Sequence, residues 1–349
     1  MHFDRAVALE SKAYTTANAS LGDVNGDGHP DIVLAKGRHW PLTQVVLLND
    51  GDGGFERRFD LSDHPDRTYT AALADLNGDG HLDLVVGNDA PDEKLVYFNG
   101  GKGQFTLSGT FGEPYWPTRN VTVADLDGDS YPDIVVANRG GPEHSANFIC
   151  MNDRHGRFLN YRELSREPAT TIAAGDLTGN GLPDLVVPHR DGGQSYLFLN
   201  DGSGGFDEKR PIGPANLGTR AVALGDLTGD GRLDVVLGDE SAGGASIYLN
   251  RGDLVFEGPI RIGEAAVVYS MAVADFTDNG SADIVLGHRD APSVVLLNNG
   301  SGRVFSVFEF GDDKGAVYGL AVGDVNGDGR PDIVAARSGA PSMLYFNSP

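Results

Sequence analysis

The chain of 349 residues has a single cysteine, Cys150, which excludes a disulfide framework within the molecule. Basic residues are also scarce: 27 Lys and Arg stand against 50 Asp and Glu, and the net charge is −23. A charge of this sign and size argues against nucleic acid or an anionic membrane surface as a partner. No apolar run approaches the roughly 18 residues of a membrane-spanning helix. The opening "MHFDRAVALE" lacks the apolar core of a signal peptide. We therefore expect no membrane span, no signal peptide, and a fold that depends on core packing and on metal.

Glycine and acidic residues are abundant, and many of them lie in one short pattern that occurs seven times. The stretch "DVNGDGHPD" begins at Asp23, and the steps from each copy to the next are 52, 50, 51, 50, 49 and 49 residues. Oxygen-bearing side chains at alternate positions, followed by Gly, are typical of the first part of an EF-hand calcium loop. Here, however, the stretch ends before the bidentate Glu and continues into an apolar segment. The pattern predicts calcium loops that connect strands. The later copies begin at Asp75, Asp125, Asp176, Asp226, Asp275 and Asp324.

Each repeat is predicted to form four short strands. A segment of alternating large and small residues such as "TAALA" precedes the loop, and a continuous apolar segment such as "DLVVG" follows it. A third strand such as "KLVYFN" leads to a Gly-rich turn, after which a fourth strand is expected to open on Phe. These phenylalanines are Phe55, Phe105, Phe158, Phe206, Phe256 and Phe305. Four antiparallel strands at a period of about 50 residues are typical of a β-propeller blade. We predict an all-β, seven-bladed propeller that occupies residues 1–349 as a single domain without a helix.

The two ends of the chain complement each other. The seventh repeat stops after its third strand, at "MLYFNSP". The segment "HFDRAVAL" places Phe3 20 residues before Asp23, the same spacing that separates Phe55 from Asp75. The N-terminal strand is therefore predicted to complete the seventh blade and close the ring.

This combination of loops and strands resembles the FG-GAP/VCBS repeat family, the calcium-loop propellers related to the head of integrin α subunits. The resemblance covers essentially the whole chain, and the family includes lectins and polysaccharide lyases. It implies up to seven structural Ca²⁺ ions. It also favours an extracellular or periplasmic location, which the residues themselves leave open.

In that family, each loop binds calcium through the side chains at positions 1, 3, 5 and 9 and the backbone carbonyl at position 7. Affinity falls with fewer carboxylates, so the loops at Asp176 and Asp275, with two each, are predicted to be weakest, and the loop at Asp125 has four. The ligands that the resemblance implies are Asp23, Asn25, Asp27, His29, Asp31; Asp75, Asn77, Asp79, His81, Asp83; Asp125, Asp127, Asp129, Tyr131, Asp133; Asp176, Thr178, Asn180, Leu182, Asp184; Asp226, Thr228, Asp230, Arg232, Asp234; Asp275, Thr277, Asn279, Ser281, Asp283; and Asp324, Asn326, Asp328, Arg330, Asp332.

The face of the propeller opposite the acidic loops, here called the top face, is predicted to vary from blade to blade. It holds the loops between second and third strands and the crossovers between blades, and function on a repetitive scaffold is usually built where the repeats differ. Thirteen residues after each first Asp stand Lys36, Asn88, Asn138, His189, Asp239, His288 and Arg337, and the next positions add Arg139, Arg190 and Arg289. Six residues before each first Asp stand Ala17, Tyr69, Arg119, Thr170, Arg220, Tyr269 and Tyr318. Both tryptophans, Trp40 and Trp116, are expected on this face.

The chemistry of these residues predicts an acidic carbohydrate as partner of a monomeric protein. Arg fits carboxylate or sulfate, and Trp and Tyr offer flat surfaces to sugar rings. The substrate-binding candidates are Trp40, Trp116, Tyr69, Lys36, Asn138, Arg139, Arg190, Arg289 and Arg337. A simpler alternative is that the tyrosines pack between blades, and that the arginines pair with acids such as Asp89 or Asp191.

Two functional hypotheses follow from this face. A polysaccharide lyase that acts on uronates by β-elimination needs a base, an acid and a cation beside the carboxylate. The catalytic candidates are His189 or His288 as base, Tyr269 or Tyr318 as acid, and Arg119 or Arg220 as carboxylate clamp. The alternative is a lectin-like or integrin-like module that binds without turnover. A pure interaction scaffold would instead lack a small-ligand pocket.

Overall fold

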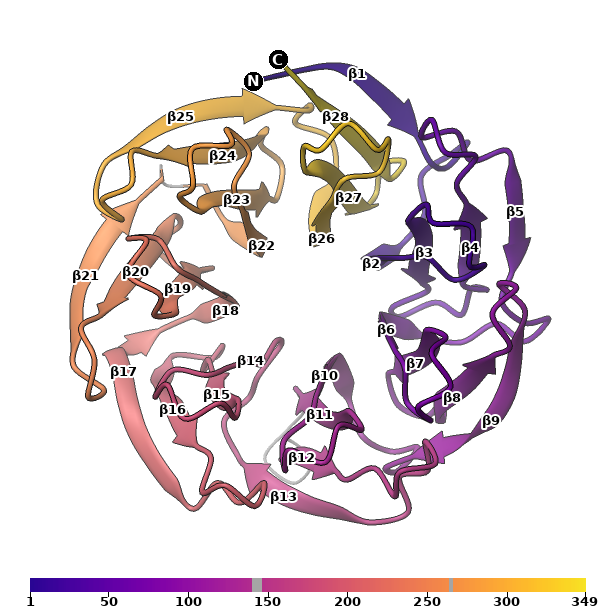
Figure 1. The fold of residues 1–349 in the computed structure, drawn as a ribbon, viewed down its shortest axis with the longest axis horizontal. Coiled ribbons are helices and arrows are strands. Elements are labelled where there is room, and N and C mark those ends of the chain that lie inside the picture. The colour runs from indigo at the N-terminus through magenta and orange to yellow at the C-terminus, as the bar shows by residue number, and fades with distance from the viewer. Residues whose placement is uncertain (140–145, 264–265) are drawn as a thin grey trace.

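The computed structural model describes residues 1–139, 146–263 and 266–349, and it contains seven four-stranded antiparallel sheets arranged in a ring (Figure 1). The prediction of an all-β, seven-bladed propeller is confirmed. All elements assigned within the described ranges are strands. No helix that is long and apolar enough to cross a membrane occurs in this part of the chain.

The strands follow one another outward from the centre within each blade. Blade one holds β2 (Thr16–Gly22), β3 (Asp31–Lys36), β4 (Val45–Leu48) and β5 (Arg57–Asp60), and blade two holds β6 (Thr68–Ala74), β7 (Asp83–Asn88), β8 (Lys94–Asn99) and β9 (Phe105–Phe111). Blade three holds β10 (Thr118–Ala124), β11 (Asp133–Asn138), β12 (Asn147–Cys150) and β13 (Tyr161–Ser165), and blade four holds β14 (Ala173–Gly175), β15 (Asp184–Val187), β16 (Gly193–Leu199) and β17 (Glu208–Leu217). Blade five holds β18 (Thr219–Gly225), β19 (Asp234–Asp239), β20 (Ala245–Asn250) and β21 (Phe256–Ile262), and blade six holds β22 (Val268–Ala274), β23 (Asp283–His288), β24 (Ser293–Asn298) and β25 (Phe305–Phe310). Blade seven holds β26 (Ala316–Gly323), β27 (Asp332–Ser338), β28 (Met343–Ser348) and the N-terminal β1 (His2–Ala8).

The hydrophobic core is divided into seven clusters, and each cluster joins two neighbouring blades. The second strands contribute to every cluster, and β7, like most of its counterparts in other blades, is buried along its whole length. This burial on both faces explains why these strands are continuous apolar segments. Between blades one and two, for example, Val33 and Val46 pack with Leu84 and Val86. Each sheet therefore depends on the next, and the seven interfaces make a closed ring.

The ring is closed by β1, as predicted. This strand pairs with β28 in antiparallel register, with Arg5 opposite Phe346 and Val7 opposite Leu344. The Phe3 ring lies 5.3 Å from that of Phe310 in blade six, measured between centroids. The first strand thus completes blade seven through backbone hydrogen bonds and also contacts the neighbouring blade.

An asparagine at the end of each third strand joins adjacent blades. In blade five, Asn250 donates from Nδ2 to the carbonyl of Leu177 in blade four at 2.9 Å. The same bond to the preceding blade occurs at every one of the seven positions, which are Asn49, Asn99, Asn152, Asn200, Asn250, Asn298 and Asn347. A buried carbonyl without a partner costs about 1–3 kcal/mol, so this repeated amide stabilises the ring.

The fourth strands begin later than predicted in three blades. Strands β9, β21 and β25 begin at Phe105, Phe256 and Phe305, but β5, β13 and β17 begin two or three residues after the expected phenylalanine. In blade three, Phe158 is buried in a core cluster before the strand starts. The position of these phenylalanines within the repeat therefore follows from packing and does not mark the start of strand pairing.

Candidate functional site

The acidic loops connect the first and second strands of each blade, and their shape depends on the first Asp. In blade one, Asp23 accepts backbone hydrogen bonds from Gly26 at 2.7 Å and Gly28 at 2.8 Å. The sixth position has a positive φ, which explains the glycine there. Ser130 adopts the same conformation in blade three, with φ of 74°, although serine is disfavoured in it. The loop geometry therefore persists where the sequence departs from the pattern.

The ninth position of each loop holds a fully or almost fully buried Asp. Asp31 accepts hydrogen bonds from the backbone N–H of Val24 at 3.0 Å and of Asn49 at 2.8 Å. Burial raises the pKa of this carboxyl, and it raises the pKa of Asp83, Asp133 and Asp332 to about 6. A carboxylate with two hydrogen bonds retains lone pairs for a cation. The ninth Asp thus ties the loop to the third strand and still qualifies as a ligand.

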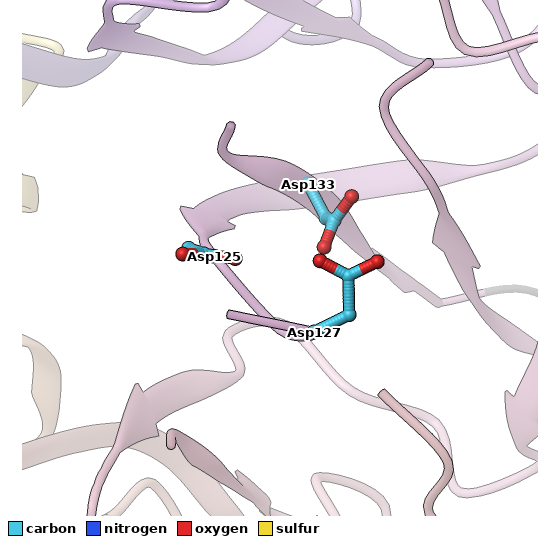
Figure 2. A group of neighbouring side chains, drawn as sticks. All are labelled: Asp125, Asp127 and Asp133. Atoms are coloured by element: carbon cyan, nitrogen blue, oxygen red, sulfur yellow. The ribbon is translucent and has the colours of Figure 1, made fainter. Parts of the chain in front are cut away.

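The loop in blade three brings three carboxylates together. Oxygens of Asp125, Asp127 and Asp133 all lie within 4.8 Å of one another, and Figure 2 shows Asp127 and Asp133 turned toward each other. Because calcium binds oxygen at about 2.3–2.6 Å, two ligands of one ion lie within about 5 Å. The cluster therefore has the dimensions of a calcium site. The fourth carboxylate of this loop, Asp129, pairs with Arg154 at 2.8 Å.

The top-face residues at or just before the start of the first strands converge on one cavity at the centre of the ring. This central pocket has a volume of about 160 Å³. The seven positions six residues before each acidic loop all line it: Ala17, Tyr69, Arg119, Thr170, Arg220, Tyr269 and Tyr318. They come from every blade because the first strands surround the centre (Figure 1). The tyrosines thus face the pocket as well as their neighbours, and Tyr269 and Tyr318 contact edge to face at 5.0 Å between centroids.

Arg220 is the most unusual residue of the pocket. It is 8% exposed, and its guanidinium lies 3.9 Å from the ring centroid of Tyr269 and 5.0 Å from that of Tyr318. Its nearest acid is Glu240, 3.7 Å away, and within the described residues its side chain makes no hydrogen bond. Burial lowers its pKa. Glu240 is instead bound by Arg190 at 2.6 Å.

Arg119 occupies the equivalent position in blade three and has a closer acidic partner. Its Nη1 lies 2.6 Å from Asp89 and donates to the carbonyl of Thr118 at 3.1 Å. The guanidinium lies 4.3 Å from the Tyr69 ring centroid. Arg119 therefore resembles Arg220 in its place on the ring and differs from it in the distance to its acid, which is 2.6 Å for Arg119 and 3.7 Å for Arg220.

The other top-face arginines surround the pocket or lie outside it. Arg289 donates to the hydroxyl of Tyr269 at 3.0 Å, whereas Arg139 pairs with Asp191 at 3.0 Å in an exposed position.

Two residues that were not predicted from the sequence also lie near the pocket. Arg38 stacks 3.9 Å from the Tyr318 ring centroid, and His39 contacts the Tyr69 hydroxyl at 3.0 Å. Both belong to the blade-one loop between β3 and β4, whose sequence "KGRHWPLT" does not recur in the other repeats.

The residues thirteen positions after each first Asp do not form part of the pocket. Lys36 is buried against Glu10 at 2.9 Å, and Arg337 donates to the carbonyl of Pro341 at 2.6 Å. Asn138 lies buried between Thr118 and the carbonyl of Ala146. These side chains hold the loops of their own blades, because the position is at the end of a fully buried second strand.

The two candidate catalytic histidines lie at this same position, away from the central pocket. His288 is 4% exposed, its Nδ1 lies 2.7 Å from the carbonyl of Pro292, and burial lowers its pKa. His189 is half-buried and does not line the pocket. The structure therefore does not bring either histidine together with Tyr269, Tyr318 and Arg220.

The two tryptophans have opposite environments. Trp40 is 63% exposed beside His39, with ring centroids 5.9 Å apart. Trp116 is 2% exposed and stacks on Phe148 at 4.1 Å between centroids. Trp116 is thus a core residue, and its ring presents no surface to a sugar.

The ring of seven sheets and the acidic loops that recur in every blade define a β-propeller built from repeats. The sequence matches the FG-GAP-like repeat model over residues 23–86, 75–136, 176–237, 226–286 and 275–335, and the chain belongs to this family. A curated relative, the T-cell immunomodulatory protein homolog of Plasmodium yoelii yoelii, is 30% identical over 82 residues, which are 21% of this chain and 12% of that protein. The match thus covers a small part of the relative.

Solved structures show the same fold in two other proteins. An Agrocybe aegerita lectin, solved for its specific recognition of non-reducing terminal N-acetylglucosamine, is 22% identical, with 86% of this chain and 81% of the lectin chain covered and a TM-score of 0.61. BBS1N, from a complex with ARL6DN, is 14% identical, with 99% and 96% covered and a TM-score of 0.66. Identities this low establish a common fold.

Proposed function

We propose that the protein binds the anionic group of an acidic, uronate-containing carbohydrate in its central pocket, and that Arg220 binds the anion. The observation that carries this proposal is the buried guanidinium of Arg220, which makes no hydrogen bond within the described residues. Burying a charge without hydrogen bonds is costly. A ligand carboxylate would supply the missing acceptors, and it fits a guanidinium in bidentate geometry.

The surroundings of Arg220 favour a sugar over a bare anion. Tyr69, Tyr269 and Tyr318 line the pocket together with the side chains of Asn18 and Asn120. Aromatic rings and amides of this kind offer apolar surface and hydrogen bonds to a sugar. The lectin with the same fold adds support of a general kind, because it shows that this architecture is compatible with carbohydrate recognition.

Binding without turnover is the form of this proposal that the geometry supports best. A lyase needs a base beside the uronate, and neither His189 nor His288 lines the pocket. Tyr269 and Tyr318 do line it, and they are the groups on which an elimination would depend. Ultraviolet absorbance of unsaturated uronates, followed after incubation with polygalacturonate, distinguishes the two forms. An increase that Tyr269→Phe and Tyr318→Phe both abolish would establish the lyase.

Replacing Arg220 tests the binding proposal. Arg220→Gln should weaken binding of a galacturonate tetramer by about 10- to 150-fold, because a hydrogen bond to a charged group is worth about 1.5–3 kcal/mol. The free energy of unfolding should fall by less than about 1 kcal/mol, since a buried charge without hydrogen bonds is removed. Titration calorimetry and thermal melts measure the two quantities.

Arg139→Gln is the matched control, because Arg139 is a top-face arginine that pairs with Asp191 outside the pocket. This variant should bind the tetramer as the unmodified protein does. If both variants lose affinity for the tetramer equally, binding depends on surface charge and not on the central pocket. No binding to the unmodified protein would exclude the proposed function.

We also propose that the acidic loops bind structural Ca²⁺. In blade three, Asp125, Asp127 and Asp133 would hold the ion, as their convergent oxygens indicate. The cation would offset the repulsion among carboxylates that the loop holds close together. The same role falls to the equivalent residues of the other loops, with lower affinity where only two carboxylates are present.

A comparison of two loops tests this ranking. Asp125 and Asp275 each accept three backbone hydrogen bonds, so replacing either with Ala removes the same internal support. In saturating calcium, Asp125→Ala should cost up to about 2.7 kcal/mol more than Asp275→Ala, the contribution of one site at 100 times its dissociation constant. With EGTA the difference should vanish. If thermal unfolding in calcium shows that the two variants lose equal stability, or that Asp275→Ala loses more, the ranking is contradicted.

A further inference from the structure

The central pocket is small, and residues from all seven blades line it. Its volume of about 160 Å³ is similar to the roughly 150 Å³ of a cavity that holds one benzene ring. Pockets for larger ligands usually measure about 300–1,000 Å³. The lining comes from the first strand, or the residues just before it, in all seven blades. A ligand can therefore enter along the axis of the ring but cannot lie across it.

The free hydrogen-bonding groups of the pocket are mainly donors. The hydroxyls of Ser20 and Thr122 donate to the carbonyls of Ala71 and Ile172. Asn18 accepts from the backbone N–H of Ala71 through Oδ1, and within the described residues the Nδ2 groups of Asn18 and Asn120 make no hydrogen bond. Arg220 adds a guanidinium with no hydrogen bond in the same part of the structure. Ser270 already donates to the carbonyl of Val317 at 2.8 Å. The pocket thus offers an acidic group several donors within a space the size of one ring.

We propose that the pocket receives a single terminal uronate unit of an acidic chain, which enters end-on along the ring axis. This inference rests on the proposed function and adds which part of the carbohydrate is recognised. Its basis is the small volume of the pocket, together with a lining that comes from all seven blades. An internal unit would need space for the chain on both sides, and the lining leaves none across the pocket.

Chain length tests the inference. Galacturonate dimer, tetramer and octamer should bind with dissociation constants within about threefold of one another when these are expressed per chain, a difference below about 1 kcal/mol. Each chain presents the same number of ends whatever its length. Affinity per chain that rises in proportion to the number of units would show that internal units bind, and would overturn the inference while leaving the proposed function in place.

Modified ends provide a second, independent readout. One tetramer carries a bulky aromatic amine at its reducing end, and another carries a neutral sugar at its non-reducing end. We expect one of these modifications to abolish calorimetric binding and the other to leave it unchanged. Arg220→Gln should weaken the binding that remains by about 10- to 150-fold. Unchanged binding of both modified tetramers would overturn end recognition. If the unmodified oligomers do not bind at all, the proposed function itself fails.

Discussion

Chelation of calcium is expected to lower the melting temperature of the protein by on the order of 10 °C or more. Each site at 100 times its dissociation constant stabilises the folded state by about 2.7 kcal/mol, and each kcal/mol moves the melting temperature of a large domain by about 2 °C or more. The loops with three or four carboxylates would supply several such sites. Their first and ninth Asp side chains also hold the connection between strands, as Asp23 and Asp31 do in blade one.

The measurement is a thermal melt followed by circular dichroism, with EGTA and then with calcium restored. Magnesium serves as the control, because it requires near-octahedral geometry and shorter bonds, and it should restore stability poorly. A melting curve that EGTA leaves unchanged would contradict structural calcium binding. The same melts on Asp125→Ala show how much of the effect belongs to blade three.

Deletion of residues 1–10 is expected to have the second large effect. It removes β1, whose backbone pairs with β28, and it removes Phe3 from its contacts with blade six. Glu10 is lost as well, which leaves Lys36 as a buried charge without its partner. Breaking a buried ion pair on one side costs about 3–5 kcal/mol, and an exposed strand edge invites association with other chains.

The truncated protein should melt at a markedly lower temperature and form soluble aggregates on size-exclusion chromatography. A synthetic peptide of residues 1–10 should restore part of the stability, because the strand can pair with β28 in trans. Glu10→Gln separates the contribution of the ion pair from that of the strand. A truncated protein that stays monomeric with an unchanged melting temperature would contradict closure by β1.

The repetitive parts of the fold were predictable from the sequence because the same residue pattern occurs in all seven repeats. The acidic loops, the buried second strands and the complementary ends gave seven blades and their closure without reference to any single residue. The asparagines that join the blades, such as Asn250, were missed although they repeat as regularly. Their role depends on a carbonyl in the preceding blade, and a one-dimensional pattern does not show such a contact.

The candidate site was only partly predictable, since exposure depends on neighbours from other blades. Arg119 and Arg220 hold equivalent sequence positions, yet Asp89 neutralises the first and the second has no hydrogen bond within the described residues. Trp116 was expected on the surface and is stacked against Phe148 in the core. His39 reaches Tyr69 from the blade-one loop between β3 and β4, whose sequence does not recur in the other blades. The periodicity of the strands predicts which side chains lie near the pocket. Whether such a side chain has a hydrogen-bond or ion-pair partner depends on residues from other blades, and the sequence pattern does not show these.

The most direct measurement of the proposed function is a crystal structure of the protein with calcium and a galacturonate tetramer. We expect a terminal unit in the central pocket, with its carboxylate within hydrogen-bonding distance of the Arg220 guanidinium and a sugar face against Tyr269 or Tyr318. A tetramer bound elsewhere on the propeller, with the Arg220 guanidinium still without an acceptor, would contradict it.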